Sequence, residues 1–270
     1  MADRDKVFAG SIPKRYDTLM VPLIFEAYAA DLAMLVANTS PISVLETAAG
    51  TGALTRALAP KLSADARYAV TDLNQPMLDY AASRQTIDRR IEWRKADALD
   101  LPFDDASFDV VCCQFGAMFF PDRIAGYAEA RRVLTPGGRF VFNVWDRIED
   151  NHFADEVTHA IGTLFPHDPP RFLARTPHGY HDVAQIREDL RRAGFTHIEI
   201  ETREKVSCAA SARDAATAYC LGTPLRNEIE TRDASALELA TDRATQAISR
   251  RHGEGPVSGK IQAHVIVATG

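Results

Sequence analysis

The sequence has 270 residues, of which 46% are hydrophobic and 25% charged, as in an ordinary globular protein. This length suffices for one large α/β domain or for two small domains. The formal net charge of -6 gives no overall attraction for a phosphate backbone. Short basic pairs such as Arg89-Arg90 are typical of solvated helix faces, so we expect no nucleic-acid partner.

Targeting signals and cysteine spacing point to an intracellular protein. Residues 1–10 lack the apolar core of a signal peptide, and no stretch approaches the length that spans a membrane. The cysteines have no zinc-binding spacing, and Cys112-Cys113 lies in an apolar run that predicts packed thiols rather than a disulfide. We therefore expect a cytoplasmic monomer or homodimer without metal or membrane insertion.

From residue 40 to residue 146, patterns of strands alternate with patterns of helices. Because these strands are apolar on both faces, the alternation predicts a parallel sheet covered by helices on both sides. An apolar helical segment, 12–37, precedes the sheet. The expected strands are 42–46, 67–71, 91–95, 108–113 and 139–145, and the expected helices are 54–62, 75–84 and 124–134.

After residue 146 the alternation ends, and longer helical stretches separate the last two strands. We see no internal repeat and no disordered linker, so we predict a single domain, 1–270. Its expected core comprises 40–146, 182–206 and 260–270, with cap insertions at 147–170 and 207–259 on or beside the carboxyl edge of the sheet. The expected helices are 153–165, 182–193, 211–222 and 233–251, and the expected strands are 197–206 and 261–268.

The segment Glu46-Thr47-Ala48-Ala49-Gly50-Thr51-Gly52 joins the first expected strand to a helix. At the carboxyl end of a strand, such a loop lets a ligand approach bare backbone, and the following helix offers free N–H groups. Ligands of open α/β sheets bind at this edge. Taken alone, the loop fits several nucleotide-binding folds.

Two acidic residues narrow the choice of ligand. Asp72 ends the second expected strand, 22 residues after Gly50, where a carboxylate can accept both hydroxyls of a ribose. Asp97 follows the third expected strand and can accept a hydrogen bond from an adenine amino group. The dinucleotide fingerprint requires a glycine where this chain has Thr55, and the chain has no GK[ST] sequence of a P-loop. A nicotinamide-dependent oxidoreductase remains the alternative.

Four motifs together carry a family resemblance: Glu46-x-Ala48-x-Gly50-x-Gly52, Asp72 with Met77, Asp97-Ala98, and Arg132-Val133-Leu134-x-Pro136-Gly137-Gly138. In this order and spacing, the chain resembles the class I S-adenosylmethionine-dependent methyltransferases. It is most similar to the small-molecule branch that includes the ubiquinone/menaquinone biosynthesis methyltransferases. The resemblance implies a Rossmann-like, doubly wound α/β fold whose seven-stranded sheet is mostly parallel, with the last strand antiparallel. It also implies methyl transfer from S-adenosylmethionine to O, N or C of a small-molecule acceptor, with S-adenosylhomocysteine as product.

The resemblance also implies a role for each matching residue. Gly50 and Gly52 would pass close to the methionine part and the ribose of the cofactor, and Glu46 would bind the methionyl amino group, directly or through water. The remaining expected cofactor contacts are Asp72 with the ribose, Leu73 and Met77 with the adenine ring, Asp97 and the Ala98 N–H with the adenine edge, and Gln114 with the methionyl end and the sulfur.

The first half of the loop departs from the family pattern. Family members usually have Asp, Gly and Cys where this chain has Glu46, Ala48 and Ala49. Ala48 tolerates close approach at negative φ and would be strained at positive φ. This departure prompts a further alternative, a non-catalytic module that binds S-adenosylmethionine.

The reaction itself demands few catalytic groups. Displacement from a sulfonium has a neutral leaving group, so the protein mainly aligns the reactants, and a base is needed only if the acceptor loses a proton. The sequence therefore identifies no catalytic residue. Its candidates are His152 as a base, Tyr16 as a contact of the methionyl carboxylate, and Trp145 as a wall of the acceptor site.

Each candidate also has an ordinary structural explanation. Tyr16 and Tyr28 would be half-buried packing residues, Trp145 a core residue and His152 a surface residue. Turn or capping roles are expected for His178 and His181. A cluster of apolar residues after the fourth strand either lines an acceptor pocket or starts a core helix: Phe115, Met118, Phe119 and Phe120.

Overall fold

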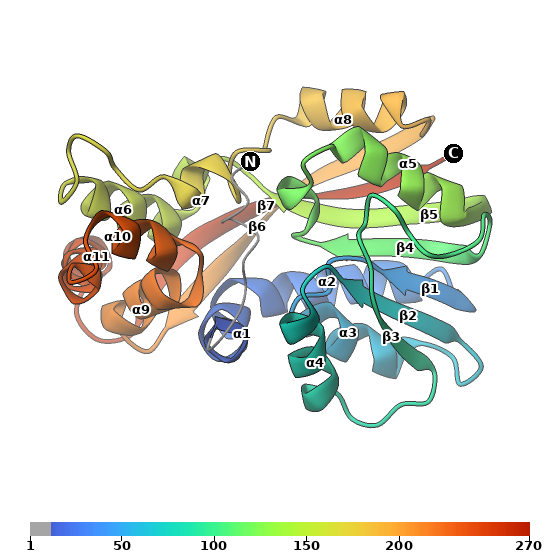
Figure 1. Ribbon diagram of the computed structural model, residues 1–270, viewed down its shortest axis with the longest axis horizontal. Coiled ribbons are helices and arrows are strands. Elements are labelled where there is room, and N and C mark those ends of the chain that lie inside the picture. The colour runs from blue at the N-terminus through green and yellow to red at the C-terminus, as the bar shows by residue number, and fades with distance from the viewer. Residues whose placement is uncertain (1–11) are drawn as a thin grey trace.

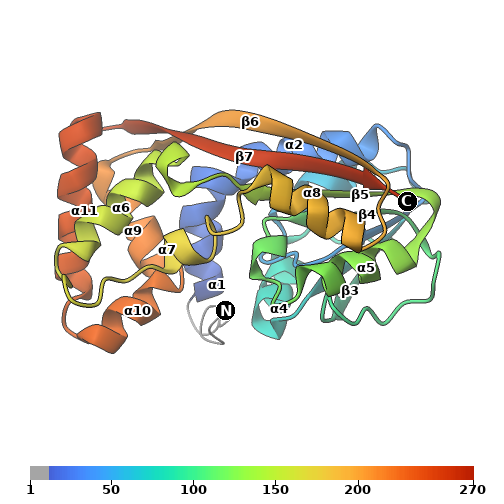
Figure 2. The ribbon, with the colours of Figure 1, turned by 90° about the horizontal axis from the view of Figure 1, so that it is seen from above.

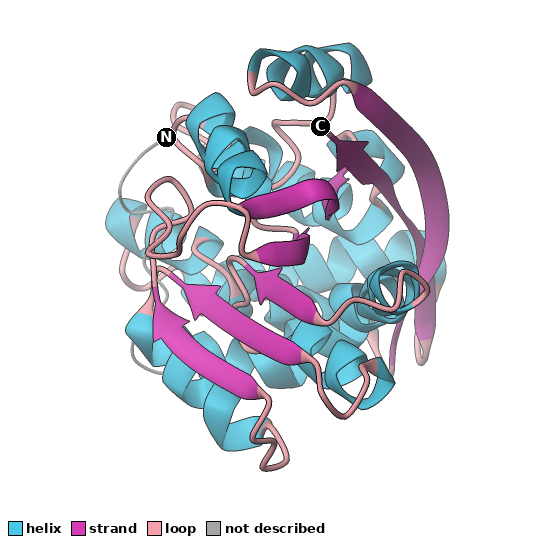
Figure 3. Ribbon diagram, turned by 90° about the vertical axis from the view of Figure 1, so that its right-hand side faces the viewer, coloured by secondary structure: helices cyan, strands magenta, loops and turns pink. Residues whose placement is uncertain are grey.

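The computed structural model describes residues 12–270, so the stretch 1–10 considered for a signal peptide lies outside it. Within the described range, seven strands form one sheet in the order β3-β2-β1-β4-β5-β7-β6 (Figures 1 and 3). Neighbouring strands are parallel from β3 to β5, and β7 is antiparallel to both β5 and β6. The predicted seven-stranded sheet is confirmed. Its strands are β1 Ser43–Glu46, β2 Arg67–Asp72, β3 Ile91–Lys95, β4 Phe108–Gln114, β5 Leu134–Trp145, β6 His197–Ala209 and β7 Val257–Thr269.

Helices cover both faces of this sheet. Residues of α2 (Glu26–Ala37), α3 (Ala53–Leu58) and α4 (Gln75–Arg84) share one buried apolar cluster, and those of α5 (Arg123–Val133) and α8 (Val183–Arg192) belong to another. Side chains of successive strand residues point to opposite faces, so Cys112 enters the first cluster and Cys113 the second. Both are buried free thiols, as predicted.

The last two strands are longer than the sheet requires. β6 and β7 pair along their whole length, from His197 with Thr269 to Ala209 with Val257, whereas β5 pairs only with the part of β7 from Ala263 onward. The rest of this ribbon runs beyond the sheet to a group of helices, the cap (Figures 1 and 2). The cap helices are α6 His152–Gly162, α7 Phe172–Arg175, α9 Ala212–Gly222, α10 Leu225–Arg232 and α11 Leu237–His252.

The N-terminal helix lies between the cap and the sheet (Figure 2). It consists of α1 (Ile12–Arg15), a π-helical segment η2 (Tyr16–Phe25) and α2. Pro22 lies within η2 and has no N–H for the regular helical pattern. Short 3₁₀ turns occur elsewhere, at Ala59–Lys61, Ala117–Phe119 and Ile148–Asp150.

The sequence expectation about membrane-spanning length was wrong for this helix. Pro13–Ala37 is helical over 25 residues with a window of mean hydropathy 1.8, which is long and apolar enough to cross a membrane. However, 56% of that window is buried inside the protein, and a buried core helix has the same composition. Tyr28, for example, is fully buried and its hydroxyl donates to the Arg203 carbonyl at 2.7 Å, which confirms its packing role.

Candidate functional site

A cavity opens at the carboxyl ends of β1, β2 and β4. Successive strands are added on one side of β1 up to β3 and on its other side from β4 onward, so this is the point where the order of strands in the sheet changes direction. The empty volume of the cavity, which includes space open to solvent, is about 1010 Å³, and this edge of an open α/β sheet is where ligands bind. The structure brings together here most of the residues predicted to contact a cofactor. These lining residues are Tyr16, Ala48, Gly50, Asp72, Leu73, Met77, Asp97, Ala98 and Gln114. Sequence reasoning did not single out Val21, Phe25, Thr51, Asn74, Leu99, Gly116 or Pro121, which also line it.

The loop after β1 has left-handed backbone at alternate residues. The φ angles are +52° at Ala48, +57° at Gly50 and +80° at Gly52. Glycine adopts this conformation freely, whereas alanine is strained in it. Ala48 was expected to be strained if its φ were positive, and its φ is positive. Its methyl group lies against Gly116, where a Cβ would be only 2.4 Å from the Ala48 Cβ.

Asp72 joins this loop to the end of β2. Its Oδ2 accepts the Gly50 N–H at 2.8 Å, and its Oδ1 accepts the Asn74 N–H at 2.7 Å. Burial raises the pKa of Asp72, and the hydrogen bonds from Asn74 and Gly50 oppose that rise. Each carboxylate oxygen can accept more than one hydrogen bond, so Asp72 can hold the loop and still accept from a ligand.

The N-terminal helix contributes Tyr16, Val21 and Phe25 to the lining of the cavity. Gln114 donates from its Nε2 to the Phe25 carbonyl at 2.9 Å, which ties the end of β4 to this helix. The rings of Tyr16 and Phe25 are stacked with centroids 5.1 Å apart. Burial raises the pKa of the Tyr16 hydroxyl, so it remains protonated. The predicted position of Tyr16 at the cavity agrees with the structure.

Glu46 is not brought to the cavity wall. Its side chain is buried between α3 and β2, where one carboxylate oxygen accepts from Thr55 Oγ1 at 2.8 Å and from the Tyr68 hydroxyl. The other oxygen, Oε1, is enclosed and has no partner among the described residues. Held by the hydroxyls of Thr55 and Tyr68, Glu46 does not line the cavity, and its contact with the methionyl amino group, directly or through water, stays a prediction.

Gly52 and His152 also lie elsewhere. Gly52 begins α3, and a Cβ there would be 3.1 Å from Ala81 Cβ, so its glycine permits close packing against α4. His152 lies near His252, at a ring distance of 5.9 Å, and its Nδ1 is 3.3 Å from the Lys260 N–H nitrogen. It lines neither the first cavity nor the one described next, so the structure gives no support to its role as a base.

A second, smaller cavity adjoins the first, with an empty volume of about 460 Å³ that includes space open to solvent. The two share a wall of four aromatic residues, Tyr16, Phe25, Phe115 and Phe119, which we call the shared wall. The segment 172–178, which lies just beyond the expected insertion 147–170, and residues of the insertion 207–259 complete this second cavity. The expectation of acceptor specificity in the insertions covers the last three of these residues and none of the first four: Phe172, Leu173, Pro177, His178, Tyr219, Thr223 and Pro224.

The aromatic residues after β4 and β5 take different places. Trp145 lines the second cavity and stacks on Phe115, with ring centroids 3.9 Å apart and planes 9° apart. Phe119 lines both cavities and Phe120 lines the first, in agreement with the pocket interpretation. Met118 is buried and lines neither, so the core interpretation holds for it.

Phe115 is held in an unusual backbone conformation. Its φ is +51°, which is strained for a bulky residue, and its N–H donates to Asn143 Oδ1 at 2.9 Å. Asn143 is fully buried on β5. This contact fixes the position of Phe115, whose ring belongs to the shared wall and stacks on Trp145.

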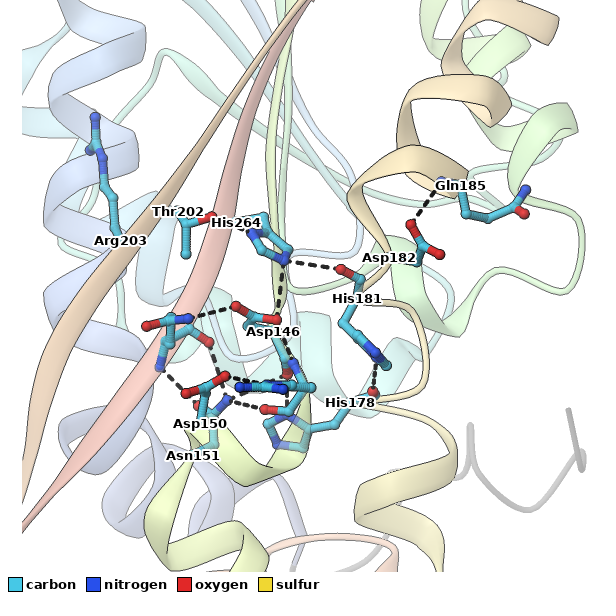
Figure 4. A network of polar contacts seen from close by, with 12 residues as sticks. Asp146, Asp150, Asn151, His178, His181, Asp182, Gln185, Thr202, Arg203 and His264 are labelled. Carbon is cyan, nitrogen blue, oxygen red and sulfur yellow. Dashed lines mark hydrogen bonds and ion pairs between the residues drawn. The ribbon is translucent and has the colours of Figure 1, made fainter.

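His178 belongs to a polar network that includes Asp146, His181 and His264 (Figure 4). Its Nδ1 lies 2.8 Å from the carbonyl oxygen of Asp146, the residue after β5. The Asp146 carboxylate accepts from Gln262 Nε2 at 2.6 Å and from the Arg147 N–H at 2.7 Å. His181 Nδ1 contacts the His178 carbonyl at 2.9 Å, the turn role expected of it, but His178 also lines the second cavity.

We expect Glu46→Gln to flatten the dependence of stability on pH. Burial raises the pKa of Glu46 to about 7 from its ordinary value of 4.5. As the pH rises, Glu46 therefore ionises in the unfolded chain before it ionises in the folded protein. The free energy of unfolding decreases as the pH rises from about 4.5, the ordinary pKa, to about 7, the pKa in the folded protein. At 1.36 kcal/mol for each pKa unit, this decrease is at most roughly 3 kcal/mol.

Urea unfolding of both proteins between pH 4.5 and pH 7.5 measures this difference. Wild type should lose more unfolding free energy than the variant over that range. Parallel curves for the two proteins would mean that the pKa of Glu46 is the same in the folded and unfolded states.

Comparison with known proteins gives one consistent result. A family model described as a methyltransferase domain matches residues 45–142. A ubiquinone/menaquinone biosynthesis C-methyltransferase of Burkholderia cenocepacia is 32% identical over 174 residues, which are 60% of this chain and 71% of that protein. A demethylmenaquinone methyltransferase of Lactiplantibacillus plantarum is 29% identical over 170 residues, 58% of this chain and 72% of that protein.

A solved structure shares the fold. Haemonchus contortus phosphoethanolamine N-methyltransferase 2, in complex with phosphomonomethylethanolamine and S-adenosylhomocysteine, superposes with a TM-score of 0.60 at 15% identity. The match covers 100% of this chain and 61% of that one. None of these comparisons supports the nicotinamide alternative.

Proposed function

This chain belongs to the class I S-adenosylmethionine-dependent methyltransferases, and we propose that its acceptor is a small apolar ring compound bound in the second cavity. The enzyme uses S-adenosylmethionine to methylate a small molecule. One observation carries the proposal: a cavity that suits this cofactor and an aromatic-lined cavity meet at the shared wall of Tyr16, Phe25, Phe115 and Phe119.

The residues of the first cavity fit the cofactor. Asp72 presents a buried carboxylate for the ribose hydroxyls. Gly50 adopts a positive φ and has no side chain, so a ligand can approach the backbone of the loop there. Leu73 and Met77 offer apolar surface for the adenine ring, with Asp97 and Ala98 at its edge. Gln114 and Tyr16, which also line this cavity, would hold the methionyl end. When bound, S-adenosylmethionine supplies an electrophilic methyl group on a sulfonium.

The second cavity suits a flat apolar molecule. Phe115 and Trp145 present stacked rings, and Phe25 and Phe172 close the sides. The curated relatives are named for menaquinone and ubiquinone biosynthesis, whose ring systems have this shape. By excluding water and holding the acceptor against the shared wall, these residues would align it with the methyl group.

Further parts of the proposal concern the whole chain. We place residues 1–270 in a single domain, whose cap supplies acceptor specificity. The enzyme would act in the cytoplasm as a monomer or homodimer, with no nucleic-acid partner and no membrane insertion. The net charge of -6 supports the absence of nucleic-acid binding.

Calorimetric titration followed by an acceptor panel tests the proposed function. We expect micromolar binding of S-adenosylhomocysteine, none of NADH, and turnover with quinol or phenol acceptors. Binding of S-adenosylhomocysteine without turnover on any ring compound would contradict the acceptor class. Lack of S-adenosylhomocysteine binding would contradict the assignment of the first cavity.

A further inference from the structure

His178 stands out in the second cavity because it is buried and yet offers an unpaired nitrogen. Its side chain comes from the segment between α7 and α8, and its Nδ1 contacts the Asp146 carbonyl at 2.8 Å. A carbonyl oxygen only accepts hydrogen bonds, so Nδ1 carries the proton. Nε2 is then a lone-pair acceptor, and it makes no hydrogen bond within residues 12–270.

The Asp146 carbonyl is held firmly in place, which fixes the orientation of the imidazole ring. The Asp146 N–H donates to the Gln262 carbonyl at 3.0 Å, and the Gln262 amide donates back to the Asp146 carboxylate at 2.6 Å. His264 Nε2 lies 3.3 Å from the same carboxylate (Figure 4). These contacts anchor Asp146 to β7, so the direction of His178 is set by the sheet.

Thr223 and Tyr219 also bring hydroxyls to this cavity, beside Tyr16 of the shared wall. Thr223 donates from its hydroxyl to the Tyr219 carbonyl at 2.7 Å and accepts the Leu225 N–H at 3.2 Å. Burial raises the pKa of Tyr219, so its phenol remains a donor as well as an acceptor. Burial also lowers the pKa of His178 to about 4, which keeps the imidazole neutral at pH 7 and its Nε2 unprotonated.

His178 also adjoins the path toward the cofactor. Its ring centroid is 6.0 Å from that of Trp145, which stacks on Phe115 of the shared wall. A flat ring along Trp145 would therefore present one edge to His178 and another to the first cavity.

We propose that His178 selects acceptors that carry a ring hydroxyl, by accepting the hydroxyl hydrogen bond at Nε2. This inference rests on the proposed function, because it assigns the polar contact of the acceptor in the second cavity. The substrate class is a hydroxylated aromatic ring, such as a phenol, naphthol or quinol. Apolar rings without a hydrogen-bond donor would leave Nε2 buried and unpaired, which costs binding free energy.

Equilibrium dialysis with two probes of similar shape tests the proposal. 1-Naphthol donates a hydrogen bond and 1-fluoronaphthalene does not. With S-adenosylhomocysteine present at saturation, wild type should bind 1-naphthol about five- to tenfold more tightly, the preference expected from one hydrogen bond. In His178→Leu this preference should fall below twofold. His178→Gln, which keeps an acceptor near the Nε2 position, should restore part of it.

Tyr219→Phe is the matched control, because it removes a hydroxyl from the same cavity and should keep the preference. Unchanged affinity for S-adenosylhomocysteine in every variant shows that the first cavity is intact. If that affinity is absent in wild type, the proposed function fails instead.

A second readout needs no variant. Addition of 1-naphthol to wild-type protein with ¹⁵N-labelled histidine should shift the His178 Nε2 resonance, and addition of 1-fluoronaphthalene should not. The proposal is overturned by a preference that survives His178→Leu, by wild type that binds neither probe or both equally, or by an unmoved Nε2 resonance.

Discussion

Asp72→Ala should weaken the binding of S-adenosylhomocysteine by about 100-fold or more. The carboxylate is placed to accept two ribose hydroxyls, and hydrogen bonds to a charged group contribute about 1.5–3 kcal/mol each. Every 1.4 kcal/mol corresponds to about tenfold in affinity. The variant also loses the acceptor of the Gly50 N–H, so the loop after β1 is less well held.

Asp97→Ala is the matched control, because Asp97 lines the same cavity but is exposed and bonds only locally, to the Leu99 N–H at 2.9 Å. It should cost about tenfold at most, since one exposed hydrogen bond contributes roughly 1 kcal/mol. Calorimetric titration measures both affinities, and circular dichroism checks the fold. An Asp72→Ala affinity within threefold of wild type would refute the placement of the ribose at β2.

Gly116→Ala should be strongly destabilising, and Ala48→Gly should partly rescue it. A Cβ at Gly116 would be 2.4 Å from Ala48 Cβ and 2.8 Å from Cys113 Sγ. Such overpacking costs roughly 1–3 kcal/mol of unfolding free energy. Ala48→Gly removes the first clash and relieves the left-handed strain, so the two substitutions should show a coupling of about 1 kcal/mol.

Urea unfolding of the wild type, both single variants and the double variant measures this coupling. Ala48→Gly alone should raise the unfolding free energy by about 0.5 kcal/mol, since relief of strain exceeds the entropy that glycine adds to the unfolded chain. Gly162→Ala, whose Cβ would have its nearest neighbour at 3.7 Å, should be nearly neutral. Strictly additive effects would mean that the loop after β1 moves independently of the segment after β4.

The sequence predicted the sheet well because the central strands β1, β2, β4 and β5 are largely buried and each ends at a polar or glycine-rich segment. Asp72 and Asp97 follow directly from this, since the ends of neighbouring parallel strands meet at one edge. The position of Glu46 could not be predicted in the same way. It depends on the hydroxyls of Thr55 and Tyr68, which come from two other elements.

The second cavity depended on contacts between segments that are distant in the chain. His178 follows the short helix α7, beyond the expected insertion 147–170, and its ring is oriented by the Asp146 carbonyl. Tyr219 comes from the insertion 207–259. The sequence indicated where specificity would reside, but no local pattern distinguished His178 from a histidine in a turn.

The ribbon of β6 and β7 has a consequence for how such enzymes diversify. Residues 210–256, which include α9, α10 and α11, leave the ribbon at Ala209 and return at Val257, two residues that are paired with each other. Because the two ends of the segment 210–256 adjoin, replacement of the whole segment would leave every strand of the parallel sheet in register. Evolution can therefore change the helices around the second cavity as one unit, while the residues around the first cavity stay the same.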